Sequence, residues 1–423
     1  MRIRFFSSGF GPSPDRMKRM PFRRRQFKKA VTLFFLSVTF LMFQNCSGSI
    51  RTLSAIAPTS ISNPSVGPTG GGGDSSSPSS IPAPAGSGWS RLANTKLTSQ
   101  CPDPNSFFGF SFLGTCANVV TSWGGAVADT KRNRLILWGG GQDDYYGNEL
   151  YALDLAQGKM LRLNDPSALA SAPNCVPQLP DGRPNSRHTY GGLAYVAHTD
   201  QMAVMGGAPA CRNGSLSKDL WLLDFAQLAA NPNSATPWSL LSSGIPETLS
   251  ILGASEYDPQ TQLVFFTDSR GNLFSLDANT HNHVLLDDTG DTGDHLTATV
   301  DVSHRLFLVL GGGSAGAYKI DGSSYRYMDW KTQLSGCSEL INTEHPGLTY
   351  DADQKKIIGW AGGSKIFILD PIQKICVTQN FSGDAPGAAL KNGTHGRFRY
   401  FPGTNSVVLV NSPSEDAYVL KLR

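Results

Sequence analysis

A short, mostly apolar strand recurs between residues 150 and 421 of this chain, and most copies end in aspartate. Most copies carry an aromatic residue at or near their centre. The copies are 150–154 (LYALD), 220–224 (LWLLD), 273–277 (LFSLD), 317–321 (AYKID) and 366–370 (IFILD), with 417–421 (AYVLK) as a weaker sixth. A strand repeated in this way cannot bury its apolar face alone, and its recurrence predicts a closed ring of small sheets.

The second strand of each unit gives the period of the repeat. Its first apolar residue is Leu135, Met202, Leu263, Leu306, Ile357 or Val407 in the six units, at intervals of 67, 61, 43, 51 and 50 residues. These intervals centre near the period of about 50 residues that is typical of kelch repeats. The two longer units are expected to carry extra loops, at 163–186 and 225–250.

Glycine pairs stand before the repeated strand in four units. They are Gly139-Gly140, Gly206-Gly207, Gly311-Gly312 and Gly362-Gly363, whereas Asp268-Ser269 and Asn411-Ser412 take their place in the third and sixth units. A glycine pair that ends the second strand, followed by an aromatic-bearing third strand, resembles the kelch motif. The resemblance implies an all-β, six-bladed propeller of the galactose oxidase/kelch-like superfamily with two degenerate blades, spanning residues 88–423.

The two ends of the repeat region are expected to pair with each other and so close the ring. The sixth unit lacks an outer strand of its own, and the segment from Trp89 to Leu92 resembles the outer strand at 238–241. We therefore expect the N-terminal strand to complete the last blade, which removes two exposed sheet edges. Seven blades remain the alternative, if 107–120 forms further strands. The aspartates that end the third strands are predicted to accept hydrogen bonds from the turns that follow.

Residues 1–45 are predicted to be an export signal. Basic residues from Arg2 to Lys29 precede an apolar run from Ala30 to Phe43, whose fourteen residues span roughly 21 Å as a helix. This is short of the ~30 Å hydrocarbon core of a membrane, so the run indicates a signal peptide rather than a membrane span.

Cys46 follows the apolar run directly. This placement resembles the lipobox of bacterial lipoproteins, in which the cysteine is lipidated and becomes the new N-terminus. The family usually has a small residue before the cysteine and an aliphatic residue three before it, where this chain has Asn45 and Phe43. Ser47 is not the aspartate that commonly retains lipoproteins at the inner membrane, so the resemblance implies an outer-membrane lipoprotein facing the periplasm or the cell surface. The alternative is a soluble secreted protein.

Residues 46–87 are predicted to be a linker. They are rich in Ser, Pro, Gly and Ala, and such a segment buries too little apolar surface to fold. Residues 1–45 contain ten Lys or Arg and one Asp, so subtracting their +9 from the whole-chain +3 leaves −6 for the remainder. A weakly acidic chain argues against nucleic acid as a partner, because phosphate binding needs a concentrated basic face.

Six cysteines remain after Cys46, and an even number in an exported protein favours disulfides. Sequence alone allows fifteen connectivities. Pairing of sequence neighbours would join Cys101 to Cys116, Cys175 to Cys211 and Cys337 to Cys376. No Cys-x-x-Cys pair is present, which disfavours a structural zinc site.

Histidines recur where each innermost strand is expected to begin. His295, His345 and His395 are fifty residues apart, and His188 is placed similarly in the second unit. They would ring one mouth of the central channel, accompanied by Asp294 and Glu344. Imidazole with carboxylate can bind a transition metal, and propellers often bind ligands at a channel mouth. The alternative is that these side chains link neighbouring blades.

Other candidate groups are less specific. The acidic loop 287–294 could hold calcium, although its spacing differs from that of an EF-hand loop, and a solvated turn is the simpler interpretation. Tyr145, Tyr146, Tyr325, Tyr327 and Trp330 are expected in or near loops, where they could contact a sugar or protein or cap the sheets. No Gly-x-Ser-x-Gly elbow, His-Glu-x-x-His pair or phosphate loop is present in the sequence.

These observations favour a non-catalytic module, monomeric and without a cofactor, that binds an envelope or extracellular protein or glycan. The alternative is a metal-dependent oxidase or hydrolase at the histidine-lined mouth, because kelch propellers include copper oxidases that resemble galactose oxidase.

Overall fold

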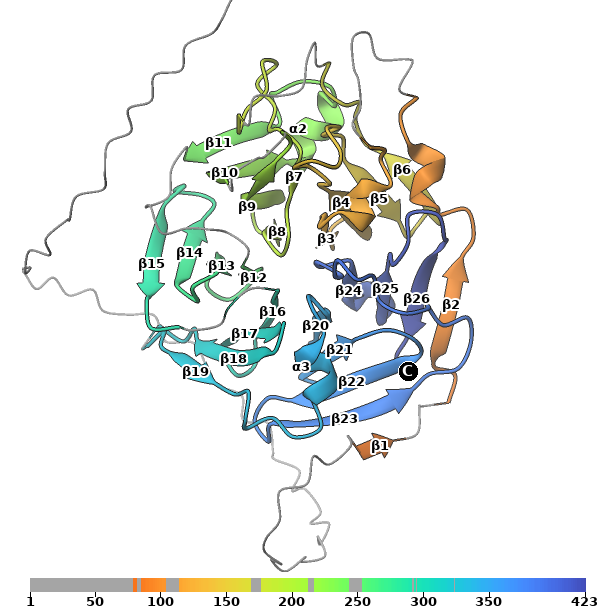
Figure 1. The fold of residues 1–423 in the computed structure, drawn as a ribbon, viewed down its shortest axis with the longest axis vertical. Helices are drawn as coiled ribbons and strands as arrows, with labels where there is room; N and C mark the ends of the chain where they lie inside the picture. Colours follow the sequence, from red (N-terminus) through yellow and green to blue (C-terminus); the bar gives the residue numbers. More distant parts are fainter. Residues whose placement is uncertain are drawn as a thin grey trace, which may run out of the picture. The chain divides into compact units, whose positions relative to one another are not determined.

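The computed structural model describes residues 79–81, 85–103, 114–168, 176–211, 217–242, 253–290, 293, 295–322 and 324–423. These residues belong to one unit of the chain, Gly72–Arg423. Six sheets surround a common centre (Figure 1), which confirms the prediction of an all-β, six-bladed propeller. No helix within the described ranges is long and apolar enough to cross a membrane.

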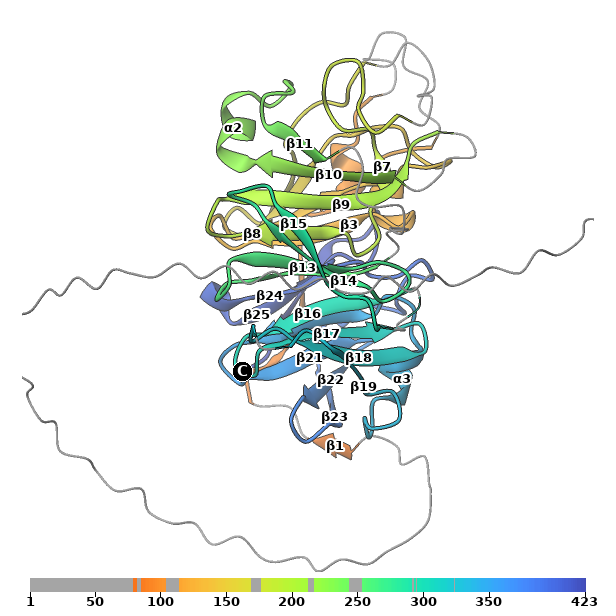
Figure 2. The same cartoon turned by 90° about the vertical axis from the view of Figure 1, so that its left-hand side faces the viewer.

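Each blade is a sheet with one strand nearest the centre (Figure 1), and Figure 2 shows the same ring from the side. The first blade consists of β3 (Gly125–Asp129), β4 (Arg134–Trp138), β5 (Tyr151–Asp154) and β6 (Lys159–Arg162), and the second of β7 (Arg187–His188), β8 (Leu193–Val196), β9 (Gln201–Pro209), β10 (Ser217–Asp224) and β11 (Trp238–Ser242). The third blade consists of β12 (Ser255–Asp258), β13 (Leu263–Thr267), β14 (Leu273–Asp277) and β15 (His283–Asp287), and the fourth of β16 (Thr297–Asp301), β17 (Leu306–Gly311), β18 (Ser314–Lys319) and β19 (Tyr327–Asp329). The fifth blade contains β20 (Gly347–Asp351), β21 (Lys356–Trp360), β22 (Lys365–Asp370) and β23 (Ile375–Asn380), and the sixth contains β24 (Phe398–Phe401), β25 (Ser406–Leu409), β26 (Ala417–Lys421) and β2 (Gly88–Leu92).

Helical segments are short and lie between strands. They are α1 (Asn118–Thr121), α2 (Phe225–Ala230), α3 (Ser338–Asn342) and the 3₁₀ turns η1 (Leu97–Gln100) and η3 (Pro402–Thr404). The chain therefore has the strand-rich character that its short apolar runs predict.

The N-terminal strand closes the ring. Strand β2 pairs antiparallel with β26 as the outermost strand of the sixth blade. Figure 1 shows β2 beside β26, although the two strands lie at opposite ends of the described chain. The predicted closure is confirmed, and the number of blades is six rather than seven.

The core lies between the faces of neighbouring blades. Between the first and second blades, for example, Trp138 and Trp221 are fully buried. The ring of Trp238 lies between them, with centroids 5.5 Å from Trp138 and 6.4 Å from Trp221. Burial of such large aromatic side chains supplies much of the free energy that holds adjacent blades together.

The first glycine pair allows the first and second blades to approach each other closely. Gly139 has a φ of +133°, and a Cβ added there would lie 2.9 Å from the Cα of Gly124 and 3.0 Å from the carbonyl oxygen of Arg187. Any larger residue at Gly139 would push the second blade away from the first.

The aspartates at the ends of the third strands stabilise the turns that follow, as predicted. Asp154 accepts from the amide of Gln157 at 2.9 Å, and Asp370 accepts from the amides of Ile372 and Gln373, both at 2.9 Å. The same type of bond is present at Asp224 and Asp277.

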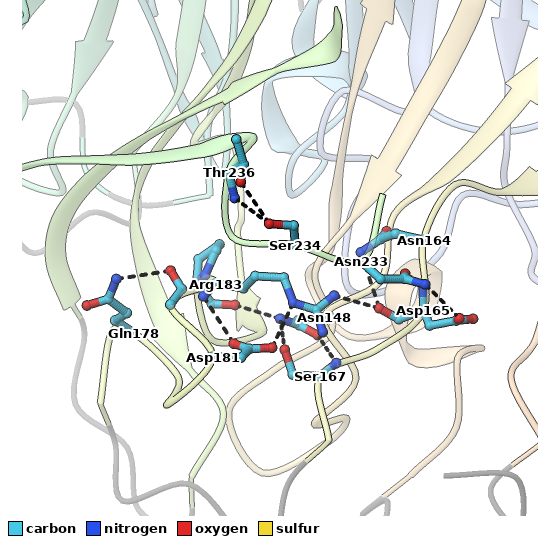
Figure 3. A network of polar contacts seen from close by, with 12 residues as sticks. Asn148, Asn164, Asp165, Ser167, Gln178, Asp181, Arg183, Asn233, Ser234 and Thr236 are labelled. Atoms are coloured by element: carbon cyan, nitrogen blue, oxygen red, sulfur yellow. Dashed lines mark hydrogen bonds and ion pairs between the residues drawn. The ribbon is translucent and has the colours of Figure 1, made fainter. Parts of the chain in front are cut away.

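The extra loops of the first and second blades bind each other through polar side chains (Figure 3). Asp165 exchanges two hydrogen bonds with Asn233, of 2.7 and 3.0 Å. Arg183 donates to the carbonyl oxygen of Asp165 at 2.7 Å, and Asn148 donates to Ser167 at 2.9 Å. The two insertions thus form one polar network between adjacent blades.

Two of the predicted disulfides are present, Cys101–Cys116 and Cys337–Cys376. In the third candidate pair, Cys175 with Cys211, Cys175 lies outside the described residues. Cys46 and the whole of residues 1–45 also lie outside them.

The predicted linker contains one strand that the sequence did not indicate. Strand β1 (Ser79–Ile81) pairs in parallel with β23, the outer strand of the fifth blade. Such pairing adds a fifth strand to that blade and covers its outer edge.

Candidate functional site

The inner strands β3, β8, β12, β16, β20 and β24 surround the centre of the ring (Figure 1) and give it two distinct ends. Histidines gather where these strands begin. Tyrosines and a cavity lie where the strands end.

At the first end, the recurring histidines come together as predicted. The ring centroids of His295 and His345 are 5.1 Å apart, and those of His345 and His395 are 4.0 Å apart. Tyr190 adds a stacked contact, 6.4 Å from His345. His188 joins this aromatic cluster through Tyr190, at 5.9 Å.

His188 lies close to, but not at, the position that corresponds to the other histidines. Tyr190, not His188, is the counterpart of the other histidines, because it shares their left-handed backbone, with φ of +49° against +66° at His295, +43° at His345 and +47° at His395. His188 lies two residues earlier, in β7. Histidine tolerates left-handed backbone better than most residues, which gives a structural reason for its recurrence.

Backbone hydrogen bonds at these positions link one blade to the next. The amide of His345 donates to the carbonyl of His295 at 2.9 Å, and the amide of Tyr190 donates to the carbonyl of Trp123 at 2.9 Å. The blade-linking role considered for the histidines is therefore present, carried by their backbone.

The imidazoles also bond within the protein. His345 donates from Nδ1 to the carbonyl oxygen of Leu296 at 3.0 Å, which leaves its Nε2 to accept from Nδ1 of His295 at 3.2 Å. His395 bonds through Nε2 to the carbonyl of Asn392. His345 and His395 are 1% and 2% exposed, so no substrate reaches either ring without a rearrangement.

Burial sets the charge of these rings. It lowers the pKa of His345 from 6.5 to about 3, and it lowers the pKa of His395 well below its ordinary value, helped by the neighbouring His345 and Arg397. Both imidazoles are neutral at physiological pH. Two ring nitrogens, Nδ1 of His188 and Nδ1 of His395, are buried and make no hydrogen bond to a described residue.

Glu344, one of the two acids expected beside the histidines, is not part of the cluster. Glu344 is exposed and makes no hydrogen bond or ion pair with a described residue, and Asp294 lies outside the described residues. The acid that contacts the cluster is Asp144, 2.8 Å from Nε2 of His188. Within the described ranges, no three His, Cys, Asp or Glu side chains are placed to hold a metal ion together.

The acidic loop is only partly described. Its first residue, Asp287, accepts from the hydroxyl of Thr289 at 2.8 Å and from the amide of Tyr327 at 2.9 Å. Asp287 therefore has a structural role in joining the third and fourth blades.

Several aromatic residues expected near the surface are buried. Tyr145, Tyr146 and Trp330 are at most 3% exposed. Tyr145 and Tyr151 both donate their hydroxyls to Glu149, at 2.7 and 2.5 Å. These residues pack within or against the blades, so their predicted capping role is confirmed and their predicted role in binding is wrong.

At the second end, a cavity of about 270 Å³ opens where the inner strands finish. All six blades contribute to its lining. Four tyrosines from four blades stand around it, namely Tyr195, Tyr257, Tyr350 and Tyr400. We call this cavity the tyrosine mouth. Its volume is close to the lower limit of about 300 Å³ for small-molecule sites.

Hydrogen bonds fix the hydroxyls of these tyrosines. Tyr195 donates to Asp200 at 3.1 Å, and Tyr350 donates to Ser303 of the neighbouring blade at 2.8 Å. His198 contacts the Tyr257 hydroxyl at 3.0 Å. Because the hydroxyls are engaged in this way, the rings present mainly apolar surface to the cavity.

Ion pairs around the tyrosine mouth join neighbouring blades. Arg132 pairs with Asp200 and Arg305 pairs with Asp258, at 2.7 and 2.6 Å. The hydrogen bonds from Arg132 are the main reason that the pKa of Asp200 is lowered to about 2. This arrangement holds the rim of the cavity in a defined shape.

One ion pair crosses the ring inside the tyrosine mouth. Arg399 is the second residue of β24 and Glu256 is the second residue of β12, so the two side chains come from opposite blades. They pair directly, with their side chains 9% and 18% exposed. Arg399 also lines a much smaller cavity of about 10 Å³ that extends toward His395.

The tyrosine mouth was not predicted from the sequence. One signal was readable, since Tyr257 and Tyr350 each stand directly before an aspartate at the end of an inner strand. The pairing of Arg399 with Glu256 had no such signal, because 143 residues separate them.

The sequence matches no protein-family model and no curated protein. Among solved structures, a protein of unknown function from Bacteroides thetaiotaomicron has 13% identity and a TM-score of 0.47, over 79% of this chain and 76% of that one. An auxiliary nutrient binding protein from the same organism has 11% identity and a TM-score of 0.45, over 78% of this chain and 75% of that one. A fungal alcohol oxidase of the AA5 family, in complex with copper, has 9% identity and a TM-score of 0.40, over 70% of this chain and 73% of that one.

Proposed function

We propose that this chain is an exported, kelch-like binding module, carried on the outer membrane by lipidated Cys46, that takes its ligand at the tyrosine mouth. The observation that supports this proposal most directly is the cavity of about 270 Å³ where the inner strands end. A concave site with apolar walls and a few fixed polar groups is the usual form of a small-molecule site. A small molecule or the end of a glycan fits this cavity better than a flat protein surface does.

The histidine end supports a structural role rather than a catalytic one. Its imidazoles are engaged with one another and with backbone carbonyls, and its backbone links adjacent blades. We therefore place the binding function at the tyrosine mouth.

A blocking substitution tests this proposal. Ala352 lies on the rim of the cavity and is exposed, so Ala352→Trp should obstruct the mouth without disturbing the core. The purified protein is incubated with a small-molecule extract of the growth medium, and bound compounds are detected by native mass spectrometry. We expect a compound that wild type retains and Ala352→Trp loses.

Ala226→Trp is the matched control, because Ala226 is exposed on α2 and does not line the cavity. This variant should retain the compound. Equal retention by Ala352→Trp and wild type would show that the tyrosine mouth is not the binding site.

A further inference from the structure

The charges inside the tyrosine mouth restrict what can bind there. Among the described residues that line the cavity, Arg399 and Glu256 are the only charged ones, and the rest are aliphatic residues, tyrosines and threonines. The lining thus contains one positive and one negative charge, and its net charge is zero.

Both charged groups are held in place by bonds to the backbone. Arg399 donates from Nε to the carbonyl oxygen of Gly396 at 3.2 Å. Glu256 accepts from the amide of Tyr257 at 3.1 Å. The guanidinium bonds to Glu256 through Nη1, and its Nη2 makes no hydrogen bond to a described residue.

A ligand with a single charge would leave one member of this pair without a partner. A carboxylate bound to Arg399 would compete with Glu256, and an ammonium bound to Glu256 would compete with Arg399. An unpaired charge between aromatic and aliphatic walls is strongly unfavourable. A ligand that carries both charges gives each residue a new partner and leaves the cavity neutral.

The tyrosine rings that form the walls of the cavity determine the polarity of the uncharged part of the ligand. The hydroxyls of Tyr195 and Tyr350 are bonded to Asp200 and Ser303, so the rings offer apolar surface above the ion pair. A body that packs against these rings must itself be apolar or aromatic. The cavity is small, which limits the ligand to a compact molecule.

We infer that the tyrosine mouth binds a small zwitterion with an apolar body, of the α-amino-acid class, with its carboxylate on Arg399 and its ammonium on Glu256. This inference rests on the proposed function and specifies its ligand class.

Matched compounds test the inference on the wild-type protein by isothermal titration calorimetry at pH 7. The first set is L-phenylalanine, 3-phenylpropionate, which lacks the ammonium, and phenethylamine, which lacks the carboxylate. The second set is L-leucine, 4-methylpentanoate and 3-methylbutylamine. At least one amino acid should bind ten-fold or more tightly than both of its singly charged analogues. Failure of both amino acids to bind, or equal or tighter binding of an analogue, would overturn the inference.

Two variants should reverse the preference in opposite directions. Glu256→Gln leaves the lining with a positive charge and should favour the carboxylate analogue over the amino acid by at least ten-fold. Arg399→Gln leaves a negative charge and should favour the amine analogue. Arg134→Gln is the control, because it also removes an arginine that pairs with an aspartate but does not line the cavity, and it should keep the wild-type preference.

The two proposals can fail separately. If a compound from the extract is retained by wild type and lost by Ala352→Trp, while neither amino acid binds, then the binding function stands and the zwitterion inference is wrong. If no compound is retained and neither amino acid binds, both are wrong.

Discussion

Trp89 lies opposite Leu420 in the antiparallel pair that closes the ring. Its side chain is 3% exposed, packs edge-on against Tyr418 with ring centroids 6.5 Å apart, and donates from Nε1 to the carbonyl of Ser364 in the fifth blade at 3.3 Å. One residue thus joins the two ends of the folded chain and contacts a neighbouring blade.

Replacement of Trp89 by alanine should destabilise the whole ring. The loss of a large buried aromatic side chain costs about 3–5 kcal/mol, and deletion of residues 89–92 should cost more because it also removes the pairing with β26. Urea denaturation followed by tryptophan fluorescence measures the change. Ser90→Ala is the control, since Ser90 is exposed in the same strand. Unchanged stability of the deletion variant would contradict closure by β2.

The two disulfides should stabilise the protein to different extents. Cys337–Cys376 spans 39 residues and ties the start of α3 to β23, whereas Cys101–Cys116 spans 15 residues. Chain entropy assigns about 4 kcal/mol to the longer loop and about 3 kcal/mol to the shorter. Paired Cys→Ser variants, compared by their denaturation midpoints, should show the larger loss for the 337–376 pair. A larger loss for the 101–116 pair would contradict this order.

The protein should lose stability in acid through its buried histidines. The pKa of His345 falls from 6.5 in the unfolded chain to about 3 in the folded protein, so the unfolded state binds a proton first as the pH falls. Stability from this residue is complete above about pH 6.5 and is lost progressively down to about pH 3, by on the order of 4 kcal/mol. His395 acts in the same direction.

The measurement for this prediction is the free energy of unfolding between pH 8 and pH 4. His345→Gln should reduce the dependence on pH, because glutamine does not titrate. His281→Gln should retain the wild-type dependence, since His281 is exposed. An unchanged slope in His345→Gln would show that other groups cause the acid sensitivity.

The lipid anchor can be tested at two adjacent residues. Cys46→Ala should release the protein from the membrane fraction and abolish labelling by radioactive palmitate. Ser47→Asp should remain lipidated but move from the outer to the inner membrane, as the lipoprotein resemblance implies. Fractionation on a sucrose gradient separates these results, and membrane retention of Cys46→Ala would contradict the lipobox prediction.

The fold was largely predictable because its determinants are local and repeated. Each third strand carries its own apolar pattern, five of the six copies end in a turn aspartate, as in Tyr151–Asp154, and six copies define a ring. The missing outer strand of the sixth unit indicated which segment closes it. Strand β1 was not predictable, since its pairing with β23 depends on an edge that only the folded blade presents.

The candidate site was less predictable because it depends on the geometry across the ring. His295, His345 and His395 recur in the sequence, and each of them has a left-handed backbone conformation, a requirement that their spacing alone does not distinguish from ligand binding. Arg399 and Glu256 stand at matching positions of opposite strands, yet neither belongs to a repeated motif. Their side chains meet because the ring is narrow enough for residues on opposite inner strands to reach each other across its centre.

Closure by β2 and β26 also orders the events of biosynthesis. The ribosome makes β2 before every blade strand except β1 and makes β26 after all of them, so β2 lacks its partner until the other five blades have been synthesised. Pairs of this long sequence separation form slowly, and an unpaired strand can associate with another chain in the meantime. A chain truncated before β26 leaves β2 without its partner, so closure of the ring has to wait for the last strand.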